Sequence, residues 1–178
     1  MNSHSARPQT AIAHQQASPF WRWLAIAAIV AMLDQLIKWW VVSAYQWGDS
    51  TYVTSFFNLV RAHNTGAAFS FLADHSGWQR WFFVAVAAFA TVFIVWQLRA
   101  HGSQKLASLS LALILGGAIG NVIDRVHRGY VVDYLDFHWA QTHFPSFNLA
   151  DVAISCGVIG MILAEIVRWR QERRQAAQ

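Results

Sequence analysis

Two aspartates lie where polar loops give way to long apolar segments, and this position makes them candidates for chemistry. Asp133 follows Val131-Val132, and Asp151 follows Phe147-Asn148-Leu149-Ala150. Acids at the margin of a membrane span are costly and are usually functional. If the two carboxyl groups meet, they cannot both ionise cheaply and would share one proton. The ionised acid can then activate a water while the protonated one hydrogen-bonds the carbonyl under attack, which is general acid–base hydrolysis.

Other polar side chains are spaced to surround such a pair. Asn64, Asn121, Arg125 and Asn148 provide donors that can hold a peptide backbone or a developing oxyanion. Asp34 and Lys38 are four residues apart, so they share one helical face and are expected to form a structural ion pair. The spacing also places Asp124 on the same face as Asn121 and Arg125.

The composition requires a membrane to position these groups. The chain has 178 residues, of which 56% are hydrophobic and 12% charged, whereas soluble domains have about 25% charged residues. Segments near 20 apolar residues cross a bilayer, and four occur, at about 21–44, 78–98, 106–123 and 147–167. We therefore predict an all-α membrane protein with four transmembrane helices rather than a soluble domain.

Basic residues orient the four predicted spans. Cytoplasmic loops carry an excess of Lys and Arg, and three groups of basic residues fall on one side: Arg7 and Arg22 before the first span, Arg99 and Lys105 between the second and third, and Arg168, Arg170, Arg173 and Arg174 after the fourth. Both termini are therefore predicted to be cytoplasmic, with the two aspartates near the opposite, periplasmic face. The net charge of +4 reflects this topology, and no nucleic-acid partner is expected.

Small residues predict where the spans approach one another. Gly116 and Gly120 form a Gly-x-x-x-Gly pair, and the fourth span carries the small residues Ala153, Gly157 and Gly160. Close approach of helices in membranes depends on such residues. We expect them to bring the third and fourth spans together, and with them Asp133 and Asp151. Cys156, in the interior of the fourth span, is expected to be a small packing residue.

The two outer loops have different compositions. The loop at about 46–77 is rich in strand formers and predicts a small β-rich periplasmic cradle, with 64–66 as a turn and 67–71 as a further strand. The loop at about 125–146 predicts a short interfacial helix or flap. Residues 1–20 are expected to form a disordered cytoplasmic tail, 21–170 a single transmembrane domain, and 171–178 a second cytoplasmic tail.

Three other interpretations remain open from these residues. Four loop histidines could hold zinc, namely His63, His127, His138 and His143, although they lack a His-Glu-x-x-His spacing. A proton-coupled transporter could use Asp34, Asp124, Asp133 and Asp151 as a relay. A non-catalytic assembly factor could use the β-rich loop as a docking surface.

Five segments in order resemble the lipoprotein signal peptidase family, also called signal peptidase II. They are Asp34-Gln35-x-x-Lys38, Asn58-x-x-Arg61-x-x-Asn64-x-Gly66-Ala67-Ala68-Phe69, Gly116-Gly117-Ala118-x-Gly120-Asn121-x-x-Asp124-Arg125, Gly129-x-Val131-Val132-Asp133 and Phe147-Asn148-x-Ala150-Asp151. Each segment alone is a weak signal, whereas five in this order are highly specific. Tyr134 departs from the resemblance, since another aromatic residue is common there.

The resemblance implies an aspartic endopeptidase of the bacterial inner membrane that needs neither metal nor cofactor. It would cut lipidated prolipoproteins before a diacylglyceryl-modified cysteine and release the signal peptide. Asp133 and Asp151 would be the catalytic pair. Asn64, Gly120, Asn121, Arg125 and Asn148 match positions around the substrate or the pair, and Asp34, Lys38 and Asp124 match supporting positions. The expected partners are these substrates and membrane lipid, and the protein is expected to be a monomer.

Overall fold

Four long helices and a small sheet make up the protein. The computed structural model describes residues 19–66, 77–102 and 104–176. The helices are α1 (Pro19–Ala44), α2 (Trp78–His101), α3 (Lys105–Arg128) and α4 (Leu149–Ala176). Each is long and apolar enough to cross a membrane, as the composition predicted. Helices satisfy their own backbone hydrogen bonds, which is what a span in hydrocarbon requires.

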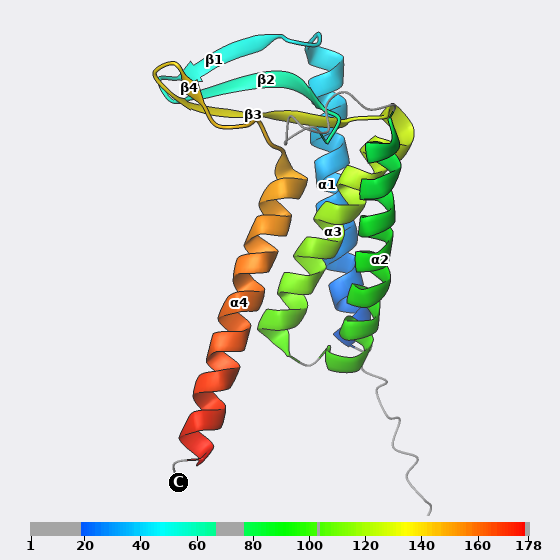
Figure 1. The fold of residues 1–178 in the computed structure, drawn as a ribbon, viewed down its shortest axis with the longest axis vertical. Helices are drawn as coiled ribbons and strands as arrows, with labels where there is room; N and C mark the ends of the chain where they lie inside the picture. Colours follow the sequence, from blue (N-terminus) through cyan, green and yellow to red (C-terminus); the bar gives the residue numbers. More distant parts are fainter. Residues whose placement is uncertain (1–18, 67–76, 103, 177–178) are drawn as a thin grey trace, which may run out of the picture.

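Helix α3 lies at the centre of the bundle, packed against each of the other helices. A cluster of buried apolar side chains joins α1, α2 and α3: Ala27, Ile94, Leu98, Leu111, Ala112 and Leu115. Outward-facing side chains are also apolar, and Phe89 on α2 is 78% exposed, as expected for contact with lipid tails. Helix α4 packs on α3 near the sheet and leans away from the other helices toward its C-terminal end (Figure 1).

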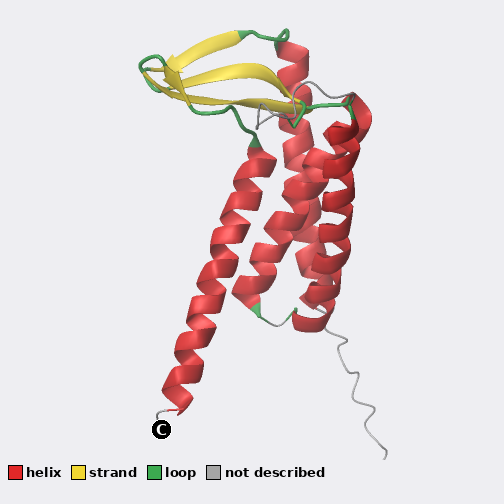
Figure 2. Cartoon of the chain, viewed as in Figure 1, coloured by secondary structure: helices red, strands yellow, loops and turns green. Residues whose placement is uncertain are grey.

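The sheet covers one end of the bundle, and the C-terminus lies at the other (Figure 2). Its strands are β1 (Ser50–Thr54), β2 (Phe57–Asn64), β3 (Val131–Trp139) and β4 (Thr142–His143), antiparallel and in the order β1-β2-β3-β4. Strands β1 and β2 confirm the β-rich cradle expected from the first outer loop. The strand predicted at 67–71 lies outside the described residues.

The second outer loop is not an interfacial helix. Helix α3 continues to Arg128, Gly129 ends it in the left-handed conformation with φ 87°, and β3 begins at Val131. Strand β2 offers this segment an antiparallel edge, and Ala62 pairs with Asp133 across the two strands. The two outer loops therefore form one sheet. Of the two forms expected for this loop, a short interfacial helix or a flap, the helix was wrong.

The glycines of α3 face different partners from those expected. A Cβ at Gly116 would lie 2.6 Å from the carbonyl oxygen of Ala27, so Gly116 allows α3 to approach α1. The approach to α4 depends instead on Gly117, which faces Ala150, and on Gly157, whose Cβ would lie 2.6 Å from the Ser110 carbonyl oxygen. The close packing of α3 and α4 is confirmed, but the assignment of Gly116 to it was wrong.

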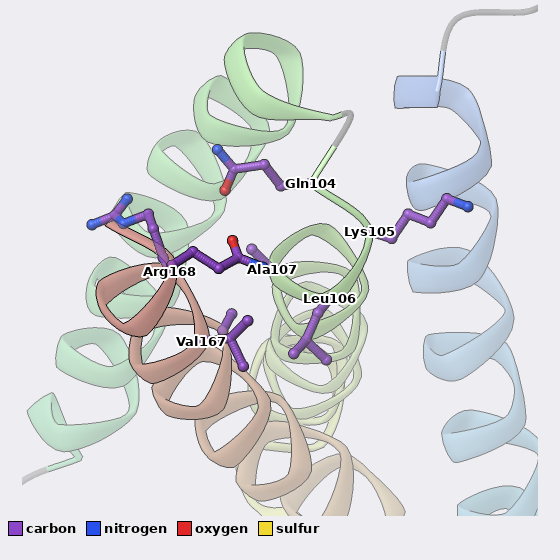
Figure 3. A pocket seen from close by; sticks show the side chains of 8 residues that line it. Gln104, Lys105, Leu106, Ala107, Val167 and Arg168 are labelled. Atoms are coloured by element: carbon purple, nitrogen blue, oxygen red, sulfur yellow. The ribbon is translucent and has the colours of Figure 1, made fainter. Parts of the chain in front are cut away.

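A cavity of about 410 Å³ lies at the end of the bundle remote from the sheet, between the start of α3 and the C-terminal part of α4. Gln104, Lys105, Val167 and Arg168 are among its lining residues, and Lys105 extends toward α1 and away from Arg168 (Figure 3). The Arg168 guanidinium donates to Glu165 at 2.5 Å. This end therefore carries basic residues that do not converge on one point.

Candidate active site

Asn148 connects the two aspartates that the sequence singled out. Its side-chain Nδ2 donates to Asp133 Oδ1 at 2.6 Å, its backbone N–H donates to Asp151 Oδ2 at 3.2 Å, and its own Oδ1 accepts the Asp151 N–H at 3.0 Å. Asn148 is fully buried. The strand that carries Asp133 and the helix that carries Asp151 are therefore brought to opposite sides of one amide, just below the sheet.

Strand pairing places Asn64 on the other carboxyl oxygen of Asp133. Ala62 pairs with Asp133 across β2 and β3, so Asn64, two residues along, lies diagonally on the same face. Its Nδ2 donates to Asp133 Oδ2 at 3.0 Å, and its Oδ1 accepts the N–H of Gly66 at 2.8 Å. Gly66 has φ 93°, and a Cβ there would lie 2.5 Å from the Phe83 ring. A side chain at position 66 would therefore disturb the turn that orients Asn64.

Asp151 is held by the first turn of its own helix. Asn148 precedes α4 and Asp151 is three residues later, so their reciprocal hydrogen bonds form the arrangement known as a capping box. The Asp151 carboxyl group therefore lies at the positive end of the helix dipole, which stabilises a negative charge. Its Oδ1 accepts the side-chain N–H of Asn121 at 2.8 Å, which fixes it to α3 as well.

A buried ammonium group lies beneath the pair. Lys38 Nζ contacts Asp34 Oδ2 at 2.8 Å, Asn121 Oδ1 at 2.9 Å and Asp124 Oδ2 at 3.1 Å. Lys38, Asp34 and Asp124 are all fully buried. An ammonium group has three N–H donors, and here each has an acceptor. The expected ion pair between Asp34 and Lys38 is confirmed, and Asp124 extends it to α3.

The two supporting aspartates act through the backbone next to the pair. Asp124 Oδ2 accepts the N–H of Val132 at 3.0 Å, and Asp34 Oδ1 accepts the N–H of Ala150 at 3.0 Å. Val132 precedes Asp133 and Ala150 precedes Asp151. Each supporting carboxylate therefore fixes the residue before one member of the pair, and Lys38 joins the two carboxylates to each other.

The electrostatics of the two carboxyl groups differ. Burial, and then the negative charge of Asp151, raise the pKa of Asp133 to about 7, although hydrogen bonds from Asn64 and Asn148 act in the opposite direction. Asp133 is 2% exposed, whereas Asp151 is partly exposed. The geometry therefore favours a proton on Asp133, as one member of a single-proton acid pair requires.

Gly120 and Arg125 occupy different positions relative to the pair. A Cβ at Gly120 would lie 2.5 Å from Asp34 Oδ2, so glycine is needed for α1 and the Asp34 carboxylate to approach α3. Arg125 Nη1 donates to the Asn121 carbonyl oxygen at 3.4 Å, and the guanidinium lies 4.9 Å from the centre of the Phe83 ring. Among the described residues its Nε has no hydrogen-bond partner.

Two residues of the site had no role in the sequence interpretation. Gln35 Nε2 donates to the Gly120 carbonyl oxygen at 3.0 Å and to Asp34 Oδ2 at 3.2 Å. The Tyr134 hydroxyl accepts the N–H of Leu149 at 3.0 Å, which ties β3 to the first turn of α4. Gln35 was present in a recognised segment, but the partner of Tyr134 depends on how the strand crosses the helix and has no local signal.

Two other sequence expectations have outcomes here. Within the described parts of the chain, no three His, Cys, Asp or Glu side chains converge as a metal site. His63 instead stacks between Trp47 and Tyr130, and His143 binds Asp136 at 2.9 Å. Cys156 is exposed on α4, so its assignment as a packing residue was wrong.

Comparison with known proteins then places the chain in a family. A family model described as signal peptidase (SPase) II matches residues 26–167. The chain belongs to the signal peptidase II family. Membership in this family identifies it as a bacterial membrane peptidase, in agreement with the four spans and with the sequence resemblance.

Curated relatives cover nearly the whole chain. Proteins named lipoprotein signal peptidase include one from Ralstonia nicotianae, 52% identical over 84% of this chain and 86% of the relative. Another, from Burkholderia vietnamiensis, is 54% identical over 85% and 91%, and one from Cupriavidus necator is 48% identical over 95% and 97%. These values extend the family relationship beyond the five motif segments.

A solved structure supports the fold of this signal peptidase II family member. It is described as a bacterial membrane enzyme, determined by the in meso method at 2.3 Å resolution, and it matches with a TM-score of 0.72 and 32% identity. The match covers 82% of this chain and 87% of that one. The helical bundle with its small sheet is therefore the fold shared with that enzyme.

Proposed function

We propose that this chain is an aspartic endopeptidase that removes the signal peptide from diacylglyceryl-modified prolipoproteins, cleaving before the lipid-modified cysteine. The observation that carries the proposal is the bridge of Asn148 between Asp133 and Asp151, two carboxyl groups at the sheet end of a membrane bundle. The relatives named lipoprotein signal peptidase support the substrate class.

The two carboxyl groups have complementary roles in this reaction. Asp151, ionised at the helix N-terminus, takes a proton from the attacking water. Asp133, protonated because its pKa is raised to about 7, donates a hydrogen bond to the scissile carbonyl and stabilises the tetrahedral oxyanion. Asp151, which now carries the proton taken from the water, then donates it to the leaving amine as the intermediate collapses. No covalent intermediate with the enzyme forms, and neither metal nor cofactor takes part.

Membrane depth is the second part of the proposal. A substrate with an apolar signal helix and acyl chains partitions into the bilayer, so a peptidase that acts on it needs a site near the membrane surface. The basic residues at the opposite end of the bundle support cytoplasmic termini and a site near the periplasmic face of the inner membrane. The fully buried side chains of Lys38, Asp34 and Asp124 support the pair from within the bundle.

Purified protein incubated with a lipidated and an unlipidated precursor peptide tests the proposal. We expect Asp133→Asn and Asp151→Asn to lower cleavage of the lipidated peptide by about 100- to 10,000-fold, the range for general acid–base groups, while binding of that peptide persists. EDTA should leave the wild-type rate unchanged, and the unlipidated peptide should remain intact.

Asp136→Asn is the matched control. Asp136 is on the same strand and 6% exposed, but it binds Asn58 and His143 instead of the pair. Its substitution should leave cleavage within about threefold of wild type, because no reacting group contacts it. Equal losses in all three variants, or a wild-type rate abolished by EDTA, would contradict the proposed mechanism.

A transporter is less well supported by the same geometry. The four acids of the hypothetical relay, Asp34, Asp124, Asp133 and Asp151, are linked through Lys38, Asn121 and Asn148 in one compact network at the sheet end. A proton relay has to continue across the membrane, and α2 carries no acidic residue.

A further inference from the structure

Two adjoining cavities lie where α4 leans away from the other helices, at the end of the bundle remote from the sheet (Figure 1). The first, of about 410 Å³, is the cavity of Figure 3 between the start of α3 and α4. The second, of about 300 Å³, is lined by residues of α2, α3 and α4. The two share four lining residues: Gln104, Ala107, Ala164 and Arg168. They therefore form one hollow, the α3–α4 cleft.

The α3–α4 cleft is apolar inside and polar at its mouth. Leu111 and Met161 line its inner part, within the spans. Gln104 and Gln171 line the part nearest the helix ends. Helix α3 begins at Lys105, so the mouth lies at the level where the spans leave the hydrocarbon. A ligand that fits the cleft has an apolar part directed into the bundle and a polar part at the membrane surface.

Arg168 is the basic residue that lines both cavities. Its Nη2 donates to Glu165 at 2.5 Å, and its Nε lies 3.8 Å from Glu172 Oε1. A guanidinium has five N–H donors, and the Arg168 side chain is 56% exposed, so it can bind a further acceptor. Lys105 extends toward α1 instead (Figure 3). One guanidinium at the mouth of the cleft suits a singly charged phosphodiester.

The surroundings of the cleft favour an anion. Basic residues outnumber acidic ones at this end of the described chain: Arg22, Arg99, Lys105, Arg168, Arg170, Arg173 and Arg174 against Glu165 and Glu172. Basic residues beside a span attract anionic headgroups. A zwitterionic headgroup gains less, because its own cation is repelled by the same residues.

We propose that the α3–α4 cleft binds an anionic diacyl phospholipid, with its phosphodiester at Arg168 and one acyl chain between Ala107 and Ala164. A partner helix is too wide, since one turn of a helix about 10 Å across fills about 400 Å³, more than the whole inner cavity. A small soluble anion would leave the apolar part of the cleft without contacts, which forfeits dispersion energy. An acyl chain fills it and needs no hydrogen-bond partner.

This lipid is separate from the substrate of the proposed reaction. Asp151 and Arg168 are seventeen residues apart on α4, which corresponds to about 25 Å along a helix. The bound lipid joins α3 to α4 at the end where the two helices diverge. Because it binds the folded bundle, it should stabilise the protein against unfolding in proportion to its occupancy.

Lipid competition on the purified protein tests the headgroup. The protein in a neutral detergent at 0.15 M salt receives equal amounts of phosphatidylglycerol and phosphatidylcholine with identical acyl chains, and native mass spectrometry gives the ratio of the two bound lipids. We expect the wild type to favour phosphatidylglycerol, and Arg168→Gln to lower the ratio by about fivefold, the effect of one arginine near an anionic headgroup. Inorganic phosphate should not displace the lipid.

Arg170→Gln is the matched control. Arg170 is on the same helix and its substitution makes the same change in charge, but it lines neither cavity. Charges at a distance are screened within about 8 Å at this salt concentration, so this variant should keep the ratio within about twofold of wild type.

Filling the cleft tests the acyl chain. Ala164 lines both cavities, and Ala164→Phe places a ring where the chain would lie. Bound phosphatidylglycerol should fall by at least about fivefold, because a filled space does not accept a second group without strain. Leu163→Phe is the control, since Leu163 is 50% exposed on the same helix and lines neither cavity.

Several outcomes would overturn the lipid site. They are equal retention of the two lipids by the wild type, equal losses in Arg168→Gln and Arg170→Gln, displacement by inorganic phosphate, and unchanged binding in Ala164→Phe. Asp133→Asn should bind phosphatidylglycerol as the wild type does. The lipid site and the aspartic mechanism can therefore fail independently of each other.

Discussion

Replacing Lys38 with methionine tests the buried network beneath the pair. Methionine nearly matches the volume of the lysine stem but removes the ammonium group that contacts Asp34 at 2.8 Å and Asp124 at 3.1 Å. Asp124 keeps the ion pair with Arg128. Asp34 keeps neutral donors, the N–H of Ala150 and the side chain of Gln35. Lys38→Met therefore leaves one fully buried carboxylate without its cation.

The expected loss of stability is large. Breaking a buried ion pair by removal of one partner costs about 3–5 kcal/mol, and whole domains are stable by about 5–15 kcal/mol. The double variant Lys38→Met with Asp34→Asn removes the isolated charge as well. It should regain at least about 1 kcal/mol relative to Lys38→Met, since a neutral amide is far cheaper to bury than a carboxylate.

Unfolding of the purified protein in detergent, followed by a spectroscopic signal against temperature or denaturant, measures these differences. Cleavage of the lipidated peptide should also fall in Lys38→Met, because Asp34 and Asp124 position the residues before Asp151 and Asp133. Lys105→Met, which removes an exposed ammonium at the other end of the bundle, should change stability by less than about 0.5 kcal/mol. A loss below about 1 kcal/mol in Lys38→Met, or a double variant less stable than the single one, would refute the reasoning.

Three further predictions follow from the same contacts. Asn148→Ala removes the cap of α4, which costs about 0.5–2 kcal/mol, and it also frees both carboxyl groups, so kcat should fall by about 100-fold or more while thermal unfolding shows only the modest loss. Gly120→Ala places a Cβ 2.5 Å from Asp34 Oδ2 and should destabilise by about 1–3 kcal/mol; unchanged unfolding would show that α1 and α3 are not in close contact there. The raised pKa of Asp133, about 7, means that the folded state binds more protons than the unfolded state between the ordinary value of 3.8 and about 7, so this group lowers stability as pH rises through that window. Asp133→Asn mimics the protonated form, and its stability relative to wild type should increase from pH 4 to 7; a pH-independent difference would contradict the raised pKa.

Features that depend on neighbouring residues along the chain were predictable from the sequence. The four spans follow from runs of apolar residues, and the ion pair of Asp34 and Lys38 follows from a spacing of four on one helix. The relation of Asn148 to Asp151 is equally local, because both belong to the first turn of α4. The residue types of the candidate site could also be selected in this way, since polar groups in a membrane segment stand out by their cost.

Features that depend on partners distant along the chain were decided by tertiary structure. Residues 131–139 became a strand because β2 was available to pair with them, and the same pairing put Asn64 against Asp133. Gly116 packs against α1 and Gly117 packs against α4. The sequence around two adjacent glycines does not indicate which helix each of them will contact. Hydrophobic periodicity reports that a face is buried, whereas the identity of the covering element depends on how all the helices pack together. For that reason the sequence determined which groups were available for catalysis, and only the packed bundle and sheet decided that Asn148 and Lys38 hold them together.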